Sequence, residues 1–236
     1  MLKSGANLAN KASSLLPAAG KRLARRYREF FSQPGSVVLV ASAFFALFVA
    51  WWVNYFAIAL ATERASNSVT DIVLSNIPLF EVDGFFVYGT FIFTIVTCGI
   101  ILARPRRIAF AFLAVALFWI IRSLLTTLTH LAPYEPHDVS DFGPAINKMF
   151  FGGDRFFSAH TGMPFLGALA FWKSIPIRIF YLLGSAYFGV VVLLGHLHYS
   201  IDVAAAFFIT YAIYHIAVWA FPRAYALFHE DDRTLP

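Results

Sequence analysis

Long apolar runs constrain this chain more than any other feature of its sequence. Six of them follow one another after residue 36, and each is close to the roughly 20 residues that an α-helix needs to cross the hydrocarbon core of a bilayer. The runs cover approximately 37–61, 84–103, 107–131, 157–173, 177–197 and 201–221. Charged residues make up only 13% of the 236 residues, against about 25% in ordinary soluble domains. The sequence therefore predicts an all-α, polytopic membrane protein built as a six-transmembrane-helix bundle.

Three parts follow from these runs. Residues 36–223 are predicted to form the transmembrane catalytic domain, 224–236 a cytoplasmic C-terminal tail, and 1–35 a cytoplasmic N-terminal segment. The N-terminal segment mixes leucine, tyrosine and phenylalanine with basic residues, which is typical of an amphipathic helix on an anionic membrane surface. A solvated tail that carries the positive-inside signal is the alternative.

Lysine and arginine are unevenly distributed between the two sides of the predicted bundle. If the N-terminus is inside, the inner side receives Lys21, Arg22, Arg25, Arg26, Arg28, Arg104, Arg106, Arg107, Lys173, Arg178, Arg223 and Arg233. The outer side keeps only Arg64, Lys148 and Arg155, and its two long connections are 62–83 and 132–158. This asymmetry predicts an integral protein of the inner or plasma membrane with both termini cytoplasmic. It also argues for the bilayer as partner and against a nucleic acid.

Two short motifs at the edges of apolar runs combine two histidines with a carboxylate. Ser158-Ala-His160-Thr161 opens the fourth run, and His198-Tyr-Ser-Ile-Asp202 lies between the fifth and the sixth. A spacing of four residues puts His198 and Asp202 on one face of a helix, so the carboxylate can hold one imidazole nitrogen and leave the other free to attack or to move a proton. His160 could then serve as an acid, on the same outer side of the membrane. For the second motif alone, a helix-capping aspartate beside an incidental histidine is the alternative.

In their wider context the motifs resemble the catalytic signatures of the sphingomyelin synthase family, a branch of the type 2 phosphatidic acid phosphatase (PAP2) superfamily. The matching segments are Gly152-Gly-Asp154-Arg-Phe-Phe-Ser158-Ala-His160-Thr161 and His198-Tyr-Ser-Ile-Asp202-Val. The family patterns are Cys-Gly-Asp, three residues, Ser-Gly-His-Thr, and His-Tyr, two residues, Asp-Val. The resemblance covers most of residues 84–221 and implies six helices with both termini cytoplasmic.

Other parts of the resemblance are weaker. Arg122-Ser-Leu-Leu-Thr126-Thr-Leu-Thr129 is similar to the family's arginine-and-threonine motif in the third span. Gly152 stands where the family has cysteine, and Ala159 replaces the glycine before the histidine. The family's Pro-Leu-Pro-Asp motif is only echoed, at residues 78–79. These departures bear on the identity of the substrate more than on the type of reaction.

The resemblance implies a two-step phosphoryl transfer. His198, oriented by Asp202, would attack the phosphorus of a phospholipid and form a phosphohistidine. His160 would protonate the departing diacylglycerol oxygen and then act as base on the incoming hydroxyl. The catalytic residues are thus expected to be His160, His198 and Asp202, and the candidates for substrate binding are Arg122, Asp154, Arg155, Ser158, Thr161 and Tyr199.

Some of these candidates have a structural alternative. Arg122, inside the third run, could snorkel or pair with a carboxylate instead of contacting phosphate. Asp154 could cap a helix, and Arg155 could form a surface ion pair with it. His130, His137 and other histidines lack a regular ligand spacing, so no metal site and no cofactor are expected.

The sequence thus predicts a lipid phosphotransferase that moves a phosphocholine- or phosphoethanolamine-type headgroup from a glycerophospholipid donor to a hydroxyl acceptor such as ceramide or diacylglycerol. Its site is expected to face the periplasmic, extracellular or luminal side. A lipid phosphate phosphatase or phospholipase C-like hydrolase is the nearest alternative, because the same residues serve a reaction resolved by water. A lipid transporter or scramblase is the alternative from another class.

Overall fold

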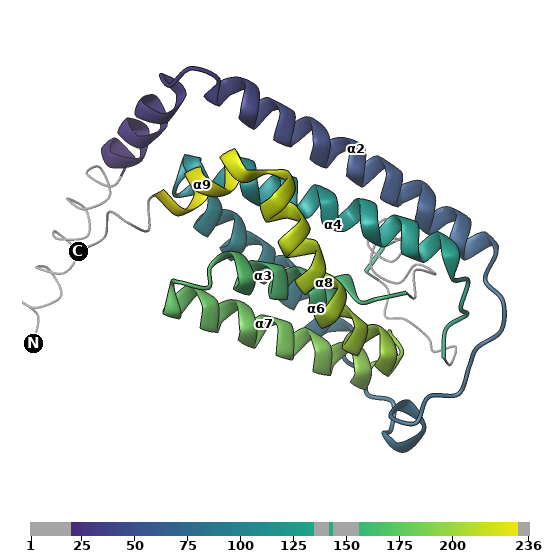
Figure 1. Cartoon of the computed structure of the whole chain (residues 1–236). Helices are drawn as coiled ribbons and strands as arrows, with labels where there is room; N and C mark the ends of the chain where they lie inside the picture. The colour runs from purple at the N-terminus through teal and green to yellow at the C-terminus, as the bar shows by residue number, and fades with distance from the viewer. Residues whose placement is uncertain (1–19, 135–141, 144–155, 231–236) are drawn as a thin grey trace, which may run out of the picture.

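The computed structural model describes residues 20–134, 142–143 and 156–230, and the regular secondary structure of these residues is all helical, joined by turns and loops (Figure 1). A helix over residues 20–31 comes first. The elements that follow are α2 (Ser36–Glu63), η1 (Leu74–Asn76), α3 (Asp83–Leu102), η2 (Pro105–Arg107), α4 (Ile108–Leu128), α6 (Ala159–Ala170), α7 (Ile175–Leu194), α8 (Ser200–Ala220) and α9 (Pro222–Glu230). The prediction of an all-α, multi-pass membrane protein is confirmed at this level.

Five helices of the described residues are long and apolar enough to cross a membrane. They are α2, α3, α4 together with η2, α7 and α8. The predicted fourth span, 157–173, contains instead the 12-residue helix α6, which is about 18 Å long at 1.5 Å per residue. The six full-length spans expected from the sequence are therefore not confirmed, and neither is an amphipathic N-terminus.

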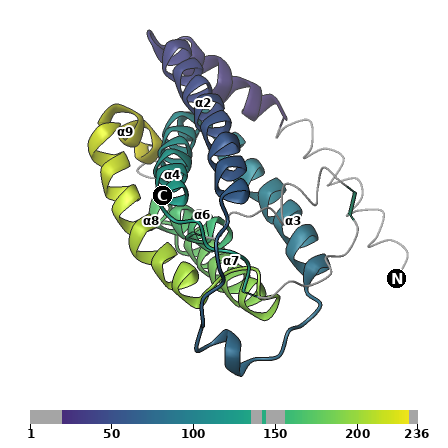
Figure 2. The ribbon, with the colours of Figure 1, turned by 90° about the vertical axis from the view of Figure 1, so that its right-hand side faces the viewer.

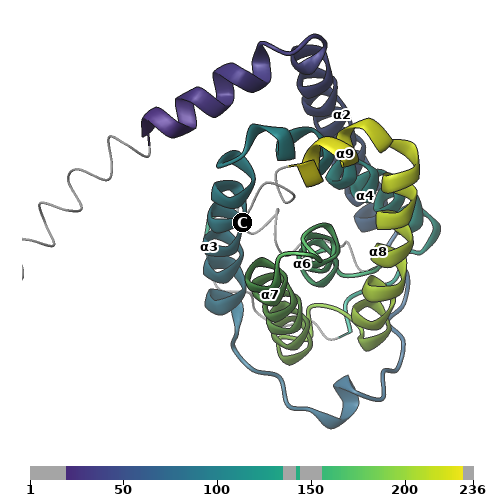
Figure 3. The same ribbon diagram turned by 60° about the vertical axis from the view of Figure 1, so that its left-hand side comes forward.

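The short helix α6 lies at the centre of the bundle. Figure 3 looks along the bundle and shows α6 surrounded by α3, α4, α7 and α8. Its residues are buried or half-buried, including Pro164 inside the helix. Because protein covers α6 on every side, its ends do not have to reach the lipid headgroups. The backbone N–H and C=O groups of the irregular segments beside α6 can form hydrogen bonds with neighbouring protein groups.

Helix α2 lies along α4 through a seam of small side chains (Figure 1). Its buried positions recur every three, four or seven residues and are Val40, Ala43, Ala50, Asn54, Ala57 and Ala61. Small residues let two membrane helices approach closely. Within the seam, the Ser123 hydroxyl donates to Oδ1 of Asn54 at 3.3 Å. The opposite side of α2 exposes phenylalanine and tryptophan, as a lipid-facing surface requires.

The two ends of the bundle are built differently. At one end, termed the α9 end, α9 packs on η2 and α4, and Nη1 of Arg106 lies 3.0 Å from Oε2 of Glu230. Residues that the sequence predicted as a tail thus form a helix as far as Glu230. At the other end, termed the site end, α6 and α8 begin. The connection between α2 and α3, which contains η1, lies at this end and is seen clearly in Figure 2.

Candidate active site

The start of α8 carries the first half of the site. Tyr199 is the N-cap residue, and its backbone N–H donates to Oδ2 of Asp202 at 3.1 Å, as in the reciprocal caps of many helices. Asp202 is completely buried. Its second oxygen, Oδ1, has no hydrogen-bond partner among the described residues. A capping role therefore accounts for only one of the two carboxylate oxygens.

His198 lies against this buried carboxylate. Its Nδ1 is 3.6 Å from Oδ2 of Asp202, and the imidazole is 7% exposed. This distance is longer than an ordinary hydrogen bond of about 2.7–3.2 Å, so the two atoms lie close together without a hydrogen bond. A proton on Nδ1 would face the Asp202 carboxyl group, and that tautomer would leave the lone pair on Nε2. The pairing that the four-residue spacing predicted is present in the structure.

The start of α6 carries the second half. Ser158 is the N-cap residue, and its Oγ accepts from the N–H of Thr161 at 3.3 Å and lies 3.3 Å from the Thr161 hydroxyl. The carbonyl of Thr161 accepts in turn from the Ser185 hydroxyl of α7 at 2.8 Å. Ser158, Thr161 and Ser185 are all buried. They form a polar cluster inside the bundle.

A backbone hydrogen bond joins the two halves directly. The N–H of Ser158 donates to the carbonyl of Asp202 at 3.2 Å. Gly189 of α7 lies beside both halves, and a Cβ there would make ordinary van der Waals contact with Val203 at 3.4 Å and Thr161 at 3.7 Å. The structure thus brings the two motifs of the sequence together, 44 residues apart in sequence, at the junction of α6, α7 and α8.

His160 lies on the α3 side of this junction. Its ring centroid is 4.4 Å from that of Phe86 and 6.2 Å from that of Phe188. Phe86 belongs to a buried cluster that includes Leu197 and Val203, the neighbours of His198 and Asp202 in sequence. His160 thus contacts a member of the cluster that also contains the sequence neighbours of His198 and Asp202.

Arg122 is held beneath the start of α6. It is 1% exposed, and its Nε donates to the carbonyl of Phe157 at 3.2 Å. The guanidinium also lies over the ring of Trp119 at 5.6 Å. A snorkelling side chain would be exposed, so that alternative is wrong. Arg122 precedes the end of α4 at Leu128 by six residues, or about 9 Å along the axis.

The connection between α2 and α3 adds a residue that the sequence did not single out. Asp71 accepts from the N–H of Ser200 at 2.7 Å, and its other oxygen accepts from Val73 and Leu74. Burial alone would raise the pKa of Asp71, but the three backbone N–H donors together lower it below the ordinary value. A carboxylate also suits the positive end of the α8 dipole. An acid near a helix start on a distant loop has no local sequence signal.

Tyr199 links the two connections at the site end. Its hydroxyl donates to the carbonyl of Ala132 at 2.9 Å and accepts from the N–H of Val69 at 3.2 Å. Its side chain is 1% exposed. Both hydrogen-bonding functions of the hydroxyl are therefore engaged by backbone groups. Tyr199, which was expected to bind substrate, is positioned to hold the connections over the site.

The backbone is strained beside both motifs. Among the described residues, the non-glycine positions with positive φ are Phe157 at 28° and His196 at 48°. Phe157 directly precedes Ser158, and His196 lies two residues before His198. Such conformations cost on the order of 1–3 kcal/mol and concentrate at functional sites. The backbone conformation at Phe157 and His196 sets the direction in which the chain leads into Ser158 and His198.

Two of the predicted substrate-binding residues, Asp154 and Arg155, lie outside the described residues. Within the described part of the chain, no three His, Cys, Asp or Glu side chains are grouped as metal ligands.

The chain matches no protein-family model, and no curated protein or solved structure is significantly similar to it.

Proposed function

We propose that this chain is a membrane lipid phosphotransferase that moves a phospho-alcohol headgroup from a glycerophospholipid to a hydroxyl acceptor. The observation that carries the proposal is the buried pair of His198 and Asp202, joined through the N–H of Ser158 to the start of α6. A buried carboxylate that faces one imidazole nitrogen is the arrangement by which proteins activate a histidine as nucleophile. The resemblance to the sphingomyelin synthase signatures supports the same reaction type.

In the first step, Nε2 of His198 attacks the phosphorus of the donor. The N–P bond forms while the bond from phosphorus to the glycerol oxygen breaks. A proton from His160 goes to that oxygen, so neutral diacylglycerol leaves. The positive charge on the His198 ring is stabilised by Asp202, whose Oδ2 is 3.6 Å from Nδ1. The product of this step is a phosphoramidate on Nε2 of His198, in which the headgroup alcohol remains esterified to phosphorus.

In the second step, the acceptor hydroxyl resolves this intermediate. His160, now without its proton, takes the proton of the hydroxyl, whose oxygen attacks phosphorus. The N–P bond breaks and its electron pair returns to Nε2 of His198. Arg122 stabilises the charge on the phosphoryl oxygens, and Ser158 and Thr161 supply hydroxyls at the start of α6. If water replaces the acceptor, the same residues carry out hydrolysis, which is the second candidate function.

The loop contacts that cover the start of α8 favour transfer over hydrolysis. The loop residues at the site end lie over the start of α8, through Asp71 and through the hydroxyl of Tyr199. A covered site of low water content protects a reactive phosphohistidine. A lipid hydroxyl can still approach from between helices within the bilayer.

The decisive experiment is mass spectrometry of lipids after incubation of the purified full chain with defined donors and acceptors. Phosphatidylcholine or phosphatidylethanolamine is supplied with and without ceramide or a distinguishable diacylglycerol. We expect the headgroup on the acceptor, and no product from His198→Ala. His215→Ala is the matched control, because His215 lies on α8, the helix that follows His198, and is exposed, with ring contacts to Tyr211 and Tyr214.

The other outcomes separate the alternatives. Free phosphocholine or phosphate as the sole product assigns hydrolysis. Movement of labelled lipid between leaflets of vesicles without chemical change, equally fast in His198→Ala, assigns transport and contradicts the proposal. With donor labelled at phosphorus, we expect an acid-labile adduct on the wild type that is absent from His198→Ala and retained in His215→Ala.

A further inference from the structure

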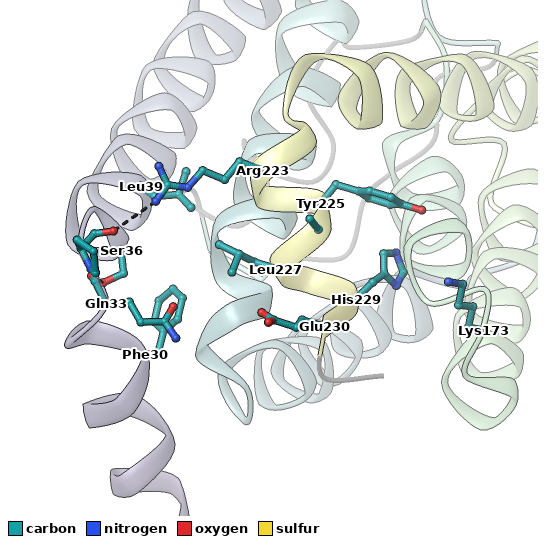
Figure 4. A pocket seen from close by; sticks show the side chains of 12 residues that line it. Phe30, Gln33, Ser36, Leu39, Lys173, Arg223, Tyr225, Leu227, His229 and Glu230 are labelled. Carbon is teal, nitrogen blue, oxygen red and sulfur yellow. Dashed lines mark hydrogen bonds between the residues drawn. The ribbon is translucent and has the colours of Figure 1, made fainter. Parts of the chain in front are cut away.

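A cavity of about 500 Å³ lies at the α9 end of the bundle, away from His198. It is enclosed by the helix over 20–31, the turn that follows it, the start of α2, the α6–α7 turn and α9 (Figure 4). Helix α8 begins at the candidate active site and ends next to α9, and its 21 residues span about 31 Å. The cavity and the candidate active site therefore lie at opposite ends of this helix. The volume is within the range of about 300–1,000 Å³ that is usual for small-ligand sites. The cavity is therefore large enough for a small ligand and is separate from the candidate active site.

Positive side chains line this cavity from two sides. Arg223 of α9 lies on the α2 side, and Lys173 of the α6–α7 turn lies on the opposite side, with His229 between them in Figure 4. The lining acid, Glu230, is paired with Arg106, at 3.0 Å. With that acid neutralised, the charge that the cavity presents to a ligand is positive.

The cationic groups retain donors for a ligand. Nη2 of Arg223 donates to the carbonyl of Pro34 at 3.3 Å, which fixes the guanidinium at the rim. This is its one hydrogen bond among the described residues, so most of its five N–H donors remain. Lys173 has no hydrogen bond or ion pair with any described residue. A fixed arginine fork and a mobile ammonium are the pair of groups that proteins use to bind phosphate.

Most of the rest of the lining is apolar and consists of Phe30, Pro34, Leu39, Ala226, Leu227 and the ring of Tyr225. Gln33 and Ser36 also line the cavity. A free phosphate ion needs no such surface, whereas the glycerol and first methylenes of a lipid do. Basic residues concentrate at this end of the bundle, and basic pockets between membrane helices on the cytoplasmic side bind anionic headgroups.

We propose that this cavity binds the phosphate group of an anionic glycerophospholipid, through Arg223 and Lys173. The site does not rest on the lipid phosphotransferase activity, because none of its residues belongs to the active site. It gives the protein a lipid contact on the leaflet opposite to that of its chemistry.

The test measures binding of dioctanoyl phosphatidic acid to the full chain in neutral detergent, by native mass spectrometry. We expect Arg223→Gln and Lys173→Gln each to weaken binding about tenfold, the usual loss for one charged hydrogen bond. Arg178→Gln is the matched control: it removes one charge at the same end, but Arg178 contacts Trp172 and does not line the cavity. Dioctanoyl phosphatidylcholine should bind at least tenfold more weakly than the acid.

Further measurements with inorganic phosphate, with the three glutamine variants and with His198→Ala test the proposed lipid site against its alternatives. Inorganic phosphate that binds as tightly as the lipid would assign the site to soluble phosphate groups and overturn the lipid. Equal weakening by all three glutamine variants would reduce the effect to surface charge and also overturn the proposal. In the His198→Ala background, Arg223→Gln and Lys173→Gln should still weaken binding of phosphatidic acid relative to His198→Ala alone, so failure of the proposed activity would leave this result unchanged.

Discussion

Oδ2 of Asp71 accepts a hydrogen bond of 2.7 Å from the backbone N–H of Ser200, across 129 residues of sequence. Ser200 is the first residue of α8 and lies two residues after His198. The contact therefore fastens the connection between α2 and α3 to the helix start that carries the proposed nucleophile. A loop far away in sequence takes part in positioning His198.

The first prediction concerns Asp71→Asn. The variant retains an acceptor but loses the charge opposite three backbone N–H donors, and we expect the free energy of unfolding at pH 7 to fall by about 1–2 kcal/mol. Because folding lowers the pKa of Asp71, its stabilisation is complete above the ordinary pKa of about 3.9. It is lost as the pH falls through the folded-state pKa.

Unfolding in mixed micelles, followed by tryptophan fluorescence at a series of pH values, checks this prediction. The difference between wild type and Asp71→Asn should shrink as the pH falls below about 4. Glu81→Gln is the matched control, since Glu81 lies on the same connection and is exposed. A difference between Asp71→Asn and wild type that stays constant down to the lowest pH would contradict the role of the charge.

The second prediction concerns Asp202→Asn. The amide can still accept from the N–H of Tyr199, so the start of α8 is retained, but the charge facing Nδ1 of His198 is lost. We expect kcat of headgroup transfer to fall by about 10²–10⁴-fold, with KM nearly unchanged. A rise in KM at constant kcat would instead mean that Asp202 acts on substrate binding.

The third prediction compares two N-cap serines. Ser158→Ala removes the cap of α6 and a partner of the Thr161 hydroxyl, and should cost about 1–2 kcal/mol of unfolding free energy. Ser174, the N-cap residue of α7, makes no side-chain cap hydrogen bond, so Ser174→Ala should change stability by no more than about 0.5 kcal/mol. Equal losses measured for the two variants would refute the assigned cap.

The fourth prediction concerns the packing of the central helix. A Cβ at Gly162 would meet Oγ1 of Thr210 at 2.7 Å and the Phe118 ring at 3.0 Å, so Gly162→Ala should destabilise by about 1–3 kcal/mol. A Cβ at Gly99 of α3 meets nothing within 4 Å, and Gly99→Ala should stabilise by about 0.5–1 kcal/mol. Adding Thr210→Ala to Gly162→Ala should recover part of the loss.

Local patterns in the sequence were enough to predict the five long apolar helices. The apolar runs predicted α2, α3, α4, α7 and α8 to within a few residues, because a membrane helix satisfies its own backbone hydrogen bonds and needs only a long apolar segment. The spacing from His198 to Asp202 predicted their contact for the same reason. A helix brings residues four apart onto one face whatever surrounds it.

The length of α6 could not be predicted in this way. The run over 157–173 is apolar enough for a span, but hydropathy does not tell whether lipid or protein surrounds a segment. In the bundle, α6 is covered by its neighbours, and its last residue is Ala170. Burial by other helices removed the requirement for a full crossing.

By itself, the sequence determined that this chain is a helical membrane protein, and which histidine is paired with which carboxylate, since both depend on interactions within one segment. The tertiary structure alone decided that Ser158 meets Asp202, that Arg122 lies beneath Phe157, and that Asp71 binds Ser200. Each of these contacts joins residues at least 35 positions apart. They arise when separate helices pack, and no local pattern in the sequence encodes which backbone group a distant side chain will reach.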